Sequence, residues 1–171
     1  MVESAFEAES SARETRFSRL YQAHFRGAVR LAYLLTGDRP LSEDIAQDAF
    51  LRLALRLAHL RDPDAFGPYL RRTVINLANA HFRHKRVERR YLEQEANQPE
   101  HLWTGPDVPE RDAIWVVLLA LPPRQRAAVV LRFYEDLSEG QIAHIMRCRP
   151  GTVKSLLSKG IAKIRAVMTD E

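Results

Sequence analysis

The sequence predicts an all-α protein of two small helical domains joined by a flexible acidic linker. Apolar residues recur at three- and four-residue intervals over most of the chain, which is typical of amphipathic helices. The period-two alternation of strands is absent. Proline and glycine gather in residues 91–112, which lack sustained periodicity and are the expected linker. We therefore expect a disordered tail over 1–16 and helical modules over 17–90 and 113–168, the second containing a helix-turn-helix.

Three helices are expected in the first module. The first follows the apolar pattern from Phe17 to Leu34, and Gly37 to Pro40 have the turn chemistry that ends it. Ser42 is the expected N-cap of the second helix, because its hydroxyl can accept a hydrogen bond from a free backbone N–H and acidic residues follow it. This helix should run over 42–60 and stop at Asp62 to Asp64, ahead of a third helix.

Residues 137–165 read as two short helices around a tight turn. Ser138 and Gln141 have the spacing of a capping box, and Pro150 suits the first position of a new helix, where no N–H is needed. The expected buried stripe of the second helix is Val153, Leu156 or Leu157, Ile161 and Ile164. Between Ser138 and Arg165 there are six Lys/Arg and one acidic residue. A helix-turn-helix that presents hydroxyls and cations fits the major groove of DNA.

Charge is distributed unevenly along the chain. The net charge is only +4, but residues 71–90 hold seven Lys/Arg and one acid, whereas 91–112 hold six acids and one base. This pattern indicates two basic modules separated by an acidic connector, and the clustering favours a nucleic-acid partner.

The composition also bears on the cellular compartment. Cys148 is the single cysteine, so an internal disulfide is excluded, as in most proteins of a reducing cytoplasm. No apolar run approaches the ~20 residues that span a bilayer. The first residues have neither a basic start nor a hydrophobic run, unlike a secretory signal. We expect a cytoplasmic protein without membrane insertion.

The basic end of the first module is a candidate nucleic-acid site. Cations neutralise phosphates, while amides and an aromatic ring can bind exposed bases. The residues are Arg71, Arg72, Asn76, Asn79, Phe82, Arg83, Lys85 and Arg86. The alternative is an ordinary solvated helix face, which the scarcity of acids for i, i+4 pairing disfavours. His81 and His84 have the spacing of a metal pair, but no further ligand cluster accompanies them, so no metal is expected.

Two further features complete the candidate sites. The helix with Asp44, Gln47 and Asp48 presents polar residues opposite an apolar stripe, which alone indicates an ordinary exposed face. No Gly-rich phosphate loop and no nucleophile–base pattern appear, so neither enzymatic activity nor a cofactor is expected.

Three segments resemble bacterial RNA polymerase sigma factors of the sigma-70 family. SEDIAQDAFLRLALR is similar to the polymerase-binding segment, and YLRRTVINLANAHFRHKR to the adjoining promoter-melting segment. LPPRQRAAVVLRFYEDLSEGQIAHIMRCRPGTVKSLLSKGIAKIR resembles sigma region four. Two modules with a short linker resemble the extracytoplasmic-function group, and YLRRTVINLA is similar to its actinobacterial members. The resemblance covers Phe17 to Val167.

The resemblance implies a role for each segment. Core polymerase would bind Asp44, Gln47, Asp48, Phe50 and Leu51, which replaces the interpretation as an ordinary exposed face. The unwound minus-ten element would bind the basic residues from Arg71 to Arg86, with flipped bases near Asn76 and Asn79. The minus-thirty-five element would bind Arg149, Thr152, Lys154, Ser155, Ser158 and Lys159. The acidic linker would mimic nucleic acid in the RNA channel, and an anti-sigma factor is a further partner that the resemblance allows.

The second module departs from the family pattern at four positions. Glycine is usual at Arg147, serine at Arg149, a basic residue at Leu156 and alanine at Gly160. Loss of a serine cap should cost ~1 kcal/mol. A glycine inside a helix should cost about 1 kcal/mol relative to alanine.

Two other functions fit parts of the sequence. A DNA-binding regulator would use the helix-turn-helix alone, with the first module as a dimerisation domain. An adaptor would sequester polymerase or another sigma factor without reading DNA. The linker and the 44–51 segment favour the sigma factor, because a regulator needs no docking face for polymerase.

Overall fold

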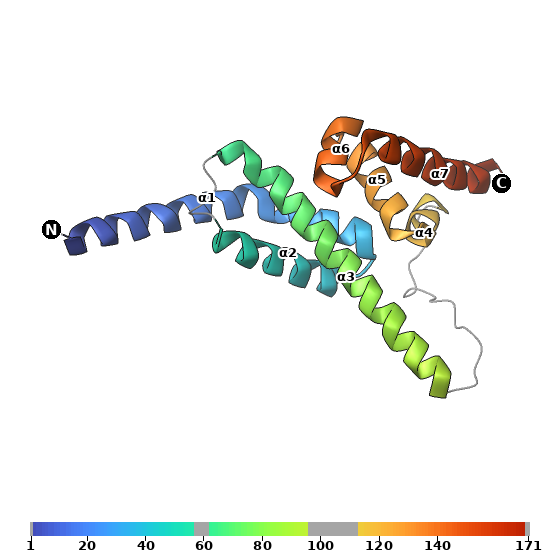
Figure 1. The fold of residues 1–171 in the computed structure, drawn as a ribbon, viewed down its shortest axis with the longest axis horizontal. Helices are drawn as coiled ribbons and strands as arrows, with labels where there is room; N and C mark the ends of the chain where they lie inside the picture. The colour runs from blue at the N-terminus through green and yellow to red at the C-terminus, as the bar shows by residue number, and fades with distance from the viewer. Residues whose placement is uncertain (1, 57–61, 96–112, 170–171) are drawn as a thin grey trace. The chain divides into compact units, whose positions relative to one another are not determined.

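The computed structural model describes residues 2–56, 62–95 and 113–169, and all regular structure in these ranges is helical (Figure 1). The elements are α1 (Val2–Thr36), α2 (Arg39–Ala54), the short 3₁₀ helix η2 (Pro63–Ala65), α3 (Phe66–Glu95), α4 (Ala113–Ala120), α5 (Pro123–Phe133), α6 (Glu139–Met146) and α7 (Pro150–Thr169). The predicted all-α fold class is confirmed. The chain divides into two compact units, Met1–Leu77 and Ala78–Glu171. The division falls inside α3, whereas the sequence predicted modules that end at 90 and begin at 113.

The core of the first unit is an aromatic cluster around Phe50. Helices α1 and α2 pack side by side (Figure 1), and Phe50 on α2 is 1% exposed. The Phe50 ring lies 5.1 Å from that of Tyr21 and 5.8 Å from that of Phe66, measured between centroids. Phe17 and Phe25 of α1 complete the cluster. Aromatic pairs at these separations stabilise a core beyond their buried area, by about 0.5–1.5 kcal/mol each.

The start of α2 corrects one expectation. Asp38, not Ser42, is the N-cap, since its side chain accepts a hydrogen bond from the Leu41 N–H at 3.0 Å. Pro40 lies in the first helical turn, where a missing N–H costs nothing, so the helix begins before Ser42. Ser42 is fully buried, and its hydroxyl lies 3.1 Å from that of Thr36.

Other helix limits also differ from the predicted ones. Residues 2–16, expected to be disordered, form the first part of α1, which is consistent with their content of the good helix formers Ala, Glu and Arg. Helix α2 ends at Ala54 rather than at 60, and 57–61 lie outside the described residues. Helix α3 continues to Glu95, five residues into the predicted linker, whose remainder (96–112) lies outside the described residues.

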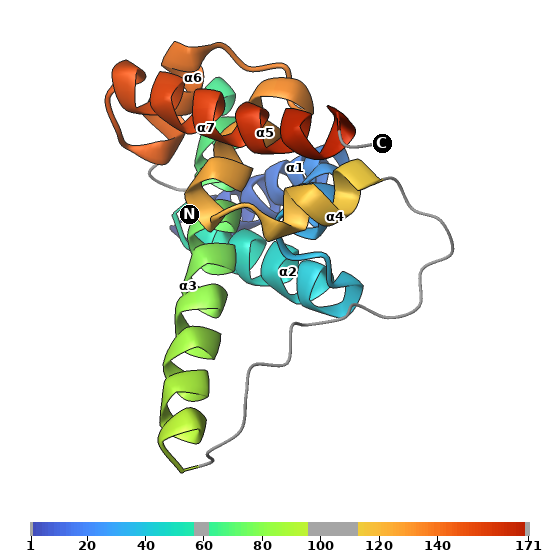
Figure 2. The same ribbon diagram turned by 90° about the vertical axis from the view of Figure 1, so that its right-hand side faces the viewer.

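Helix α7 is the centre of the second group of helices and packs against α4, α5 and α6 (Figure 2). The sequence left open whether Leu156 or Leu157 belongs to the buried stripe of α7. Val153 and Leu157 are buried, whereas Leu156 is only half-buried, so the stripe contains Leu157. Ile161 and Ile164, also expected in the buried stripe, are half-buried.

Gly160 is buried on the same side of α7, and a Cβ there would lie 2.8 Å from Val129 Cγ2 of α5. The glycine is therefore not simply a helix-weakening residue, since it permits close helix packing.

Arg126 of α5 is hydrogen-bonded to the carboxyl end of α4. Its guanidinium donates hydrogen bonds to the carbonyl oxygens of Leu119 and Leu121, the latter at 3.1 Å. These carbonyls lie at the end of α4, where helical acceptors lack intrahelical partners. Burial lowers the pKa of Arg126 to about 10, which leaves the side chain cationic at neutral pH.

Candidate nucleic-acid interface

The helix-turn-helix formed by α6 and α7 begins as predicted. The Ser138 hydroxyl accepts from the Gln141 N–H at 3.3 Å, and the Gln141 side chain accepts from the Ser138 N–H at 2.9 Å. This capping box fixes the start of α6. Pro150 is the first residue of α7, also as predicted.

The turn between these helices contains a left-handed residue. Arg147 has φ 49° and ψ 53°, and the Cys148 N–H donates to the Ala143 carbonyl at 3.0 Å. A side chain in this conformation costs roughly 1–2 kcal/mol relative to glycine. The turn thus keeps the geometry that glycine usually provides, at an energetic cost that the arginine imposes.

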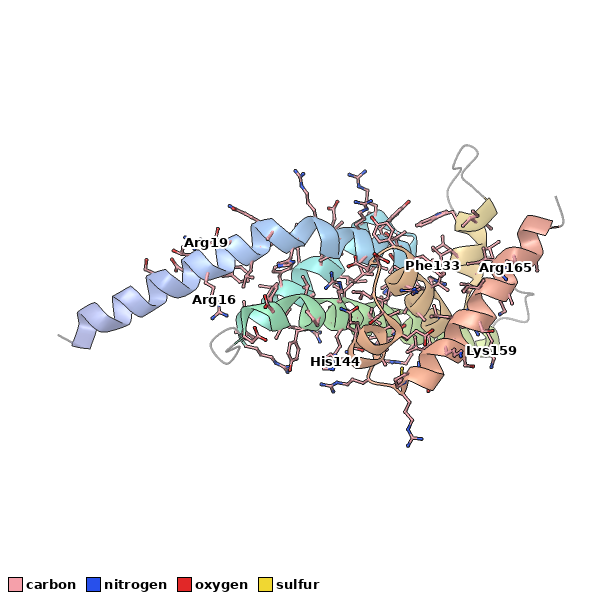
Figure 3. The ribbon with its side chains drawn as sticks, turned by 90° about the horizontal axis from the view of Figure 1, so that it is seen from above. Arg16, Arg19, Phe133, His144, Lys159 and Arg165 are labelled. Atoms are coloured by element: carbon pink, nitrogen blue, oxygen red, sulfur yellow. The ribbon has the colours of Figure 1, made fainter. Side chains whose placement is uncertain are left out.

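The outward face of α7 carries hydroxyls and cations. All six residues predicted to bind the minus-thirty-five element are exposed: Arg149, Thr152, Lys154, Ser155, Ser158 and Lys159. Figure 3 shows Lys159 and Arg165 on α7. Because Val153 and Leu157 anchor the opposite side, the polar residues form one solvent-facing surface. The Arg149 carbonyl accepts from the N–H groups of Thr152 and Val153, so Arg149 stands at the very start of the helix.

On α3, three- and four-residue spacing places part of the predicted set in one row. This α3 row comprises Tyr69, Arg72, Asn76, Asn79 and Arg83, opposite the buried Leu70, Val74 and Ala78. Tyr69, which the sequence interpretation missed, is 40% exposed, and the Arg72 guanidinium lies 5.4 Å from its ring centroid. The row combines an aromatic ring, amides and cations, which are the groups that bind unstacked bases and their phosphates.

The other predicted α3 residues lie away from this row. Arg71 is half-buried and close to His24 of α1. The burial of His24 lowers the pKa of this histidine, and the positive charge of Arg71 lowers it further. Phe82 is half-buried and Lys85 is exposed, and both are displaced around the helix from Asn79 and Arg83. The Arg86 side chain lies outside the described residues.

On α2, an acidic and apolar row faces solvent. This α2 row runs through Asp44, Gln47, Asp48, Leu51 and Leu55 at helical spacing. Leu51 is 64% exposed and Leu55, which the sequence interpretation missed, is 84% exposed. Asp48 accepts a hydrogen bond from Arg52 Nε at 2.9 Å.

Phe50 was expected among the contact residues of α2. Its burial in the aromatic cluster makes it a core residue that supports the α2 row from behind.

The described residues contain no group of three or more His, Cys, Asp or Glu that could hold a metal ion. Within the same ranges, no helix is both long and apolar enough to cross a bilayer.

Comparison with known proteins places both groups of helices in one family. Residues 20–88 match Sigma-70 region 2, and residues 111–164 match Sigma-70, region 4. The RNA polymerase sigma-E factor of Streptomyces coelicolor is 32% identical over 137 residues, which cover 80% of this chain and 77% of that protein. The ECF RNA polymerase sigma factor SigW of Bacillus subtilis is 28% identical over 155 residues, covering 82% of each.

A solved structure shares the fold. The sigma factor RpoE of Bartonella quintana, crystallised with the anti-sigma factor NepR, matches with a TM-score of 0.66 at 18% identity, over 90% of this chain and 97% of that one. The fold and both regions thus define a promoter-directing sigma factor of RNA polymerase. The chain belongs to the sigma-70 family, in its extracytoplasmic-function group.

Proposed function

We propose that this sigma factor divides its work among three helix faces: the α2 row binds core polymerase, the α3 row holds the unwound minus-ten element, and the outward face of α7 reads the minus-thirty-five element. The observation that carries the proposal is that the three faces differ in chemistry. Acidic and apolar groups occur on α2, aromatic and amide groups on α3, and hydroxyls and cations on α7.

The α2 row suits a protein partner rather than DNA. Its carboxylates would repel phosphates, and an apolar pair as exposed as Leu51 and Leu55 is typical of a surface that is covered on binding. A complementary surface on polymerase would offer cations to Asp44 and Asp48 and an apolar contact to the leucines. Phe50 contributes by fixing the position of α2.

The α3 row suits single-stranded DNA. A base that stacks on an aromatic side chain gains ~1–3 kcal/mol, which is comparable with the few kcal/mol needed to unstack it from the duplex. Tyr69 therefore joins Asn76 and Asn79 as a proposed base contact, and Arg72 and Arg83 bind the adjoining phosphates. Arg71, Phe82, Lys85 and Arg86 flank this contact.

The outward face of α7 suits the duplex major groove. Thr152, Ser155 and Ser158 can reach base edges, while Lys154 and Lys159 can neutralise phosphates. Arg149, at the start of the helix, is positioned for a guanine or a phosphate.

The proposed role implies the binding partners of the protein and the compartment in which it acts. Core RNA polymerase and promoter DNA are the proposed partners, and the cytoplasm is the proposed site of action. The complex of RpoE with NepR supports an anti-sigma factor as a further partner. We assign the chain no catalytic step, and we propose that the acidic linker occupies the RNA channel.

In vitro transcription with purified core enzyme tests the function as a whole. Promoter-dependent transcripts from a genomic library, with protection of both promoter elements, are the expected result. Binding to duplex DNA without transcription would favour the regulator. Binding to core polymerase without protection of either element would favour the adaptor.

A charge reversal tests the α2 row. Asp48→Arg should weaken binding to core polymerase at least tenfold, because it replaces a carboxylate of the row by a cation beside Arg52. Asp64→Arg is the matched control, since Asp64 is an exposed carboxylate on η2 rather than on α2. Competition with a reference sigma factor for core enzyme measures both. Equal effects of the two variants would contradict the assignment.

A further inference from the structure

Arg147 has a backbone conformation that an arginine rarely adopts, in the turn that leads into α7. Its φ of 49° and ψ of 53° lie in the left-handed region. Among the described residues, Asp136 is the other non-glycine residue with a positive φ, also 49°. Aspartate visits this region because its short side chain can hydrogen-bond locally, a compensation that arginine lacks. An unfavourable conformation of this kind is typical of functional sites, where the side chain contributes something that glycine could not.

The Arg147 side chain is exposed and lies in a positively charged stretch of the chain. Arg149, two residues further on, is exposed as well. No aspartate or glutamate occurs in residues 140–169, so no carboxylate lies beside these arginines in the sequence. Neither guanidinium forms an ion pair within the part of the chain that the structure describes. The fold of this part therefore does not explain the arginine, which points to a ligand of negative charge.

Hydrogen bonds hold the turn between α6 and α7 (Figure 2) in one backbone conformation. The N–H groups of Arg147 and Cys148 both donate to the Ala143 carbonyl, that of Cys148 at 3.0 Å. On the other side of the turn, the Arg149 carbonyl accepts from the Thr152 N–H at 2.9 Å. A side chain presented from a fixed backbone loses less conformational freedom on binding than one on a flexible loop, so its contact contributes more to affinity.

The position of the turn favours the DNA backbone as the ligand. In a helix-turn-helix, the first residues of the second helix contact base edges in the major groove, and the first helix crosses the sugar-phosphate backbone. Arg147 lies between these two helices. It is therefore expected near the phosphates at the edge of the groove that α7 enters. A guanidinium can donate two parallel hydrogen bonds to a phosphate, which neither glycine nor the hydroxyls of α7 can do.

We propose that Arg147 binds a phosphate at the edge of the minus-thirty-five element, in addition to the six contact residues proposed above. The phosphate contact offsets the cost of the left-handed conformation and strengthens binding without reading the base sequence. This inference rests on the proposed function, because α7 must lie in the groove for the turn to approach the backbone.

Arg147→Gly should change stability and DNA binding in opposite directions. Glycine adopts a positive φ without a steric penalty, so the variant should unfold at a higher urea concentration than the wild type. Loss of one phosphate contact should weaken promoter binding by the holoenzyme roughly fivefold at ~0.15 M salt. It should also make the slope of log K against log salt concentration shallower by about 0.9. A residue that is merely tolerated on the surface would raise stability but leave the slope unchanged, and that result would overturn the inference.

Two matched variants separate the charge of Arg147 from a general loss of positive charge. Arg147→Lys retains a cation, so its slope should stay near that of the wild type, although the paired hydrogen bonds are lost. Arg124→Gln removes an exposed cation of α5 that belongs to none of the proposed contact faces, and it should also leave the slope near that of the wild type. An equal change in Arg124→Gln and Arg147→Gly would reject a local contact at the turn.

Neutral methylphosphonate linkages, placed one at a time around the minus-thirty-five element, locate the phosphate. At the phosphate that Arg147 contacts, neutralisation should weaken binding of the wild-type holoenzyme but have less effect on Arg147→Gly, because both changes remove the same interaction. Additive losses at every position would contradict the contact. A loss of discrimination between base pairs in Arg147→Gly, with an unchanged salt slope, would point to a base edge and also reject the phosphate.

The proposed function and this inference can fail separately. Failure of the wild-type holoenzyme to bind any promoter would reject the proposed function itself. If Lys154→Glu on α7 reduces the salt slope whereas Arg147→Gly does not, the proposed function stands and the inference is wrong.

Discussion

Helices α3 and α7 both present polar residues opposite a buried stripe, but the two faces differ in ways that matter for DNA. The α3 row holds Tyr69, Asn76 and Asn79, whose ring and amides can bind bases that have left the duplex. The α7 face holds short hydroxyls and lysines, and α7 follows a tight turn that sets it beside α6. Two helices of similar net charge are thus suited to different states of the same ligand, single-stranded and duplex DNA.

Removing the amides of the α3 row should have the largest effect. Asn76→Ala with Asn79→Ala should lower open-complex formation on the order of 100-fold, because each lost base contact is worth ~1–3 kcal/mol. Duplex binding at the minus-thirty-five element should be unchanged, which would separate the two faces. Permanganate reactivity of unpaired thymines measures opening. His84→Ala, on α3 but displaced from the row, is the control, and equal losses in both variants would contradict a base-contact role.

Reversing one charge on α7 should produce the opposite pattern. Lys154→Glu should weaken minus-thirty-five binding roughly tenfold and reduce its salt slope by about 1 or more, since one phosphate contact is lost. Opening of a template already unwound at the minus-ten element should be unaffected. Filter binding over a range of salt concentrations measures the slope. An unaltered slope would mean that Lys154 does not contact phosphate.

Gly160 in the second unit is closely packed, whereas Gly27 in the first unit has open space around it, so the same substitution should have opposite effects on stability. Gly160→Ala should destabilise the protein by about 1–3 kcal/mol, because the new methyl group would collide with Val129. Gly27→Ala should stabilise it by up to ~1 kcal/mol, since its surroundings are empty and alanine favours the helix. Urea unfolding measures both. The losses caused by Gly160→Ala and Val129→Ala should be less than additive in the double variant, because the smaller side chain makes room for the new methyl group. A stabilising Gly160→Ala would refute the packing explanation.

The smallest expected effect concerns pH. Burial and the nearby charge of Arg71 lower the pKa of His24 in the folded state from its usual value of 6.5. Between the folded and unfolded pKa values the unfolded chain binds more protons, so stability should increase as the pH rises toward and past 6.5. His24→Gln should flatten this dependence in thermal unfolding measured from pH 5 to 7.5. An unchanged profile would show that other groups cause it.

Much of the site was predictable because it rests on local rules. The capping box at Ser138 and Gln141 and the start of α7 at Pro150 depend only on neighbouring residues, and both predictions are confirmed. The exposure of the six α7 residues follows from helical periodicity once the buried stripe is recognised.

The exposure of other residues could not be predicted, because their environment comes from distant segments. Phe50 belongs to the same short segment as Asp48 and Leu51, yet four aromatic rings from α1 and α3 surround it. Leu55 and Tyr69 were missed for the converse reason, because an apolar or aromatic residue is first assigned to the core and only the packing shows it exposed.

The sequence by itself determined the helical fold class, the order of the segments and the family, since these depend on periodicity, capping chemistry and motif spacing. The tertiary structure decided which side of each helix is available to a partner. It showed that Gly160, which the sequence marks as a residue that weakens α7, permits the close packing of α7 against α5. The physical reason is that burial depends on the neighbours that packing supplies, and residues far away in the sequence provide them.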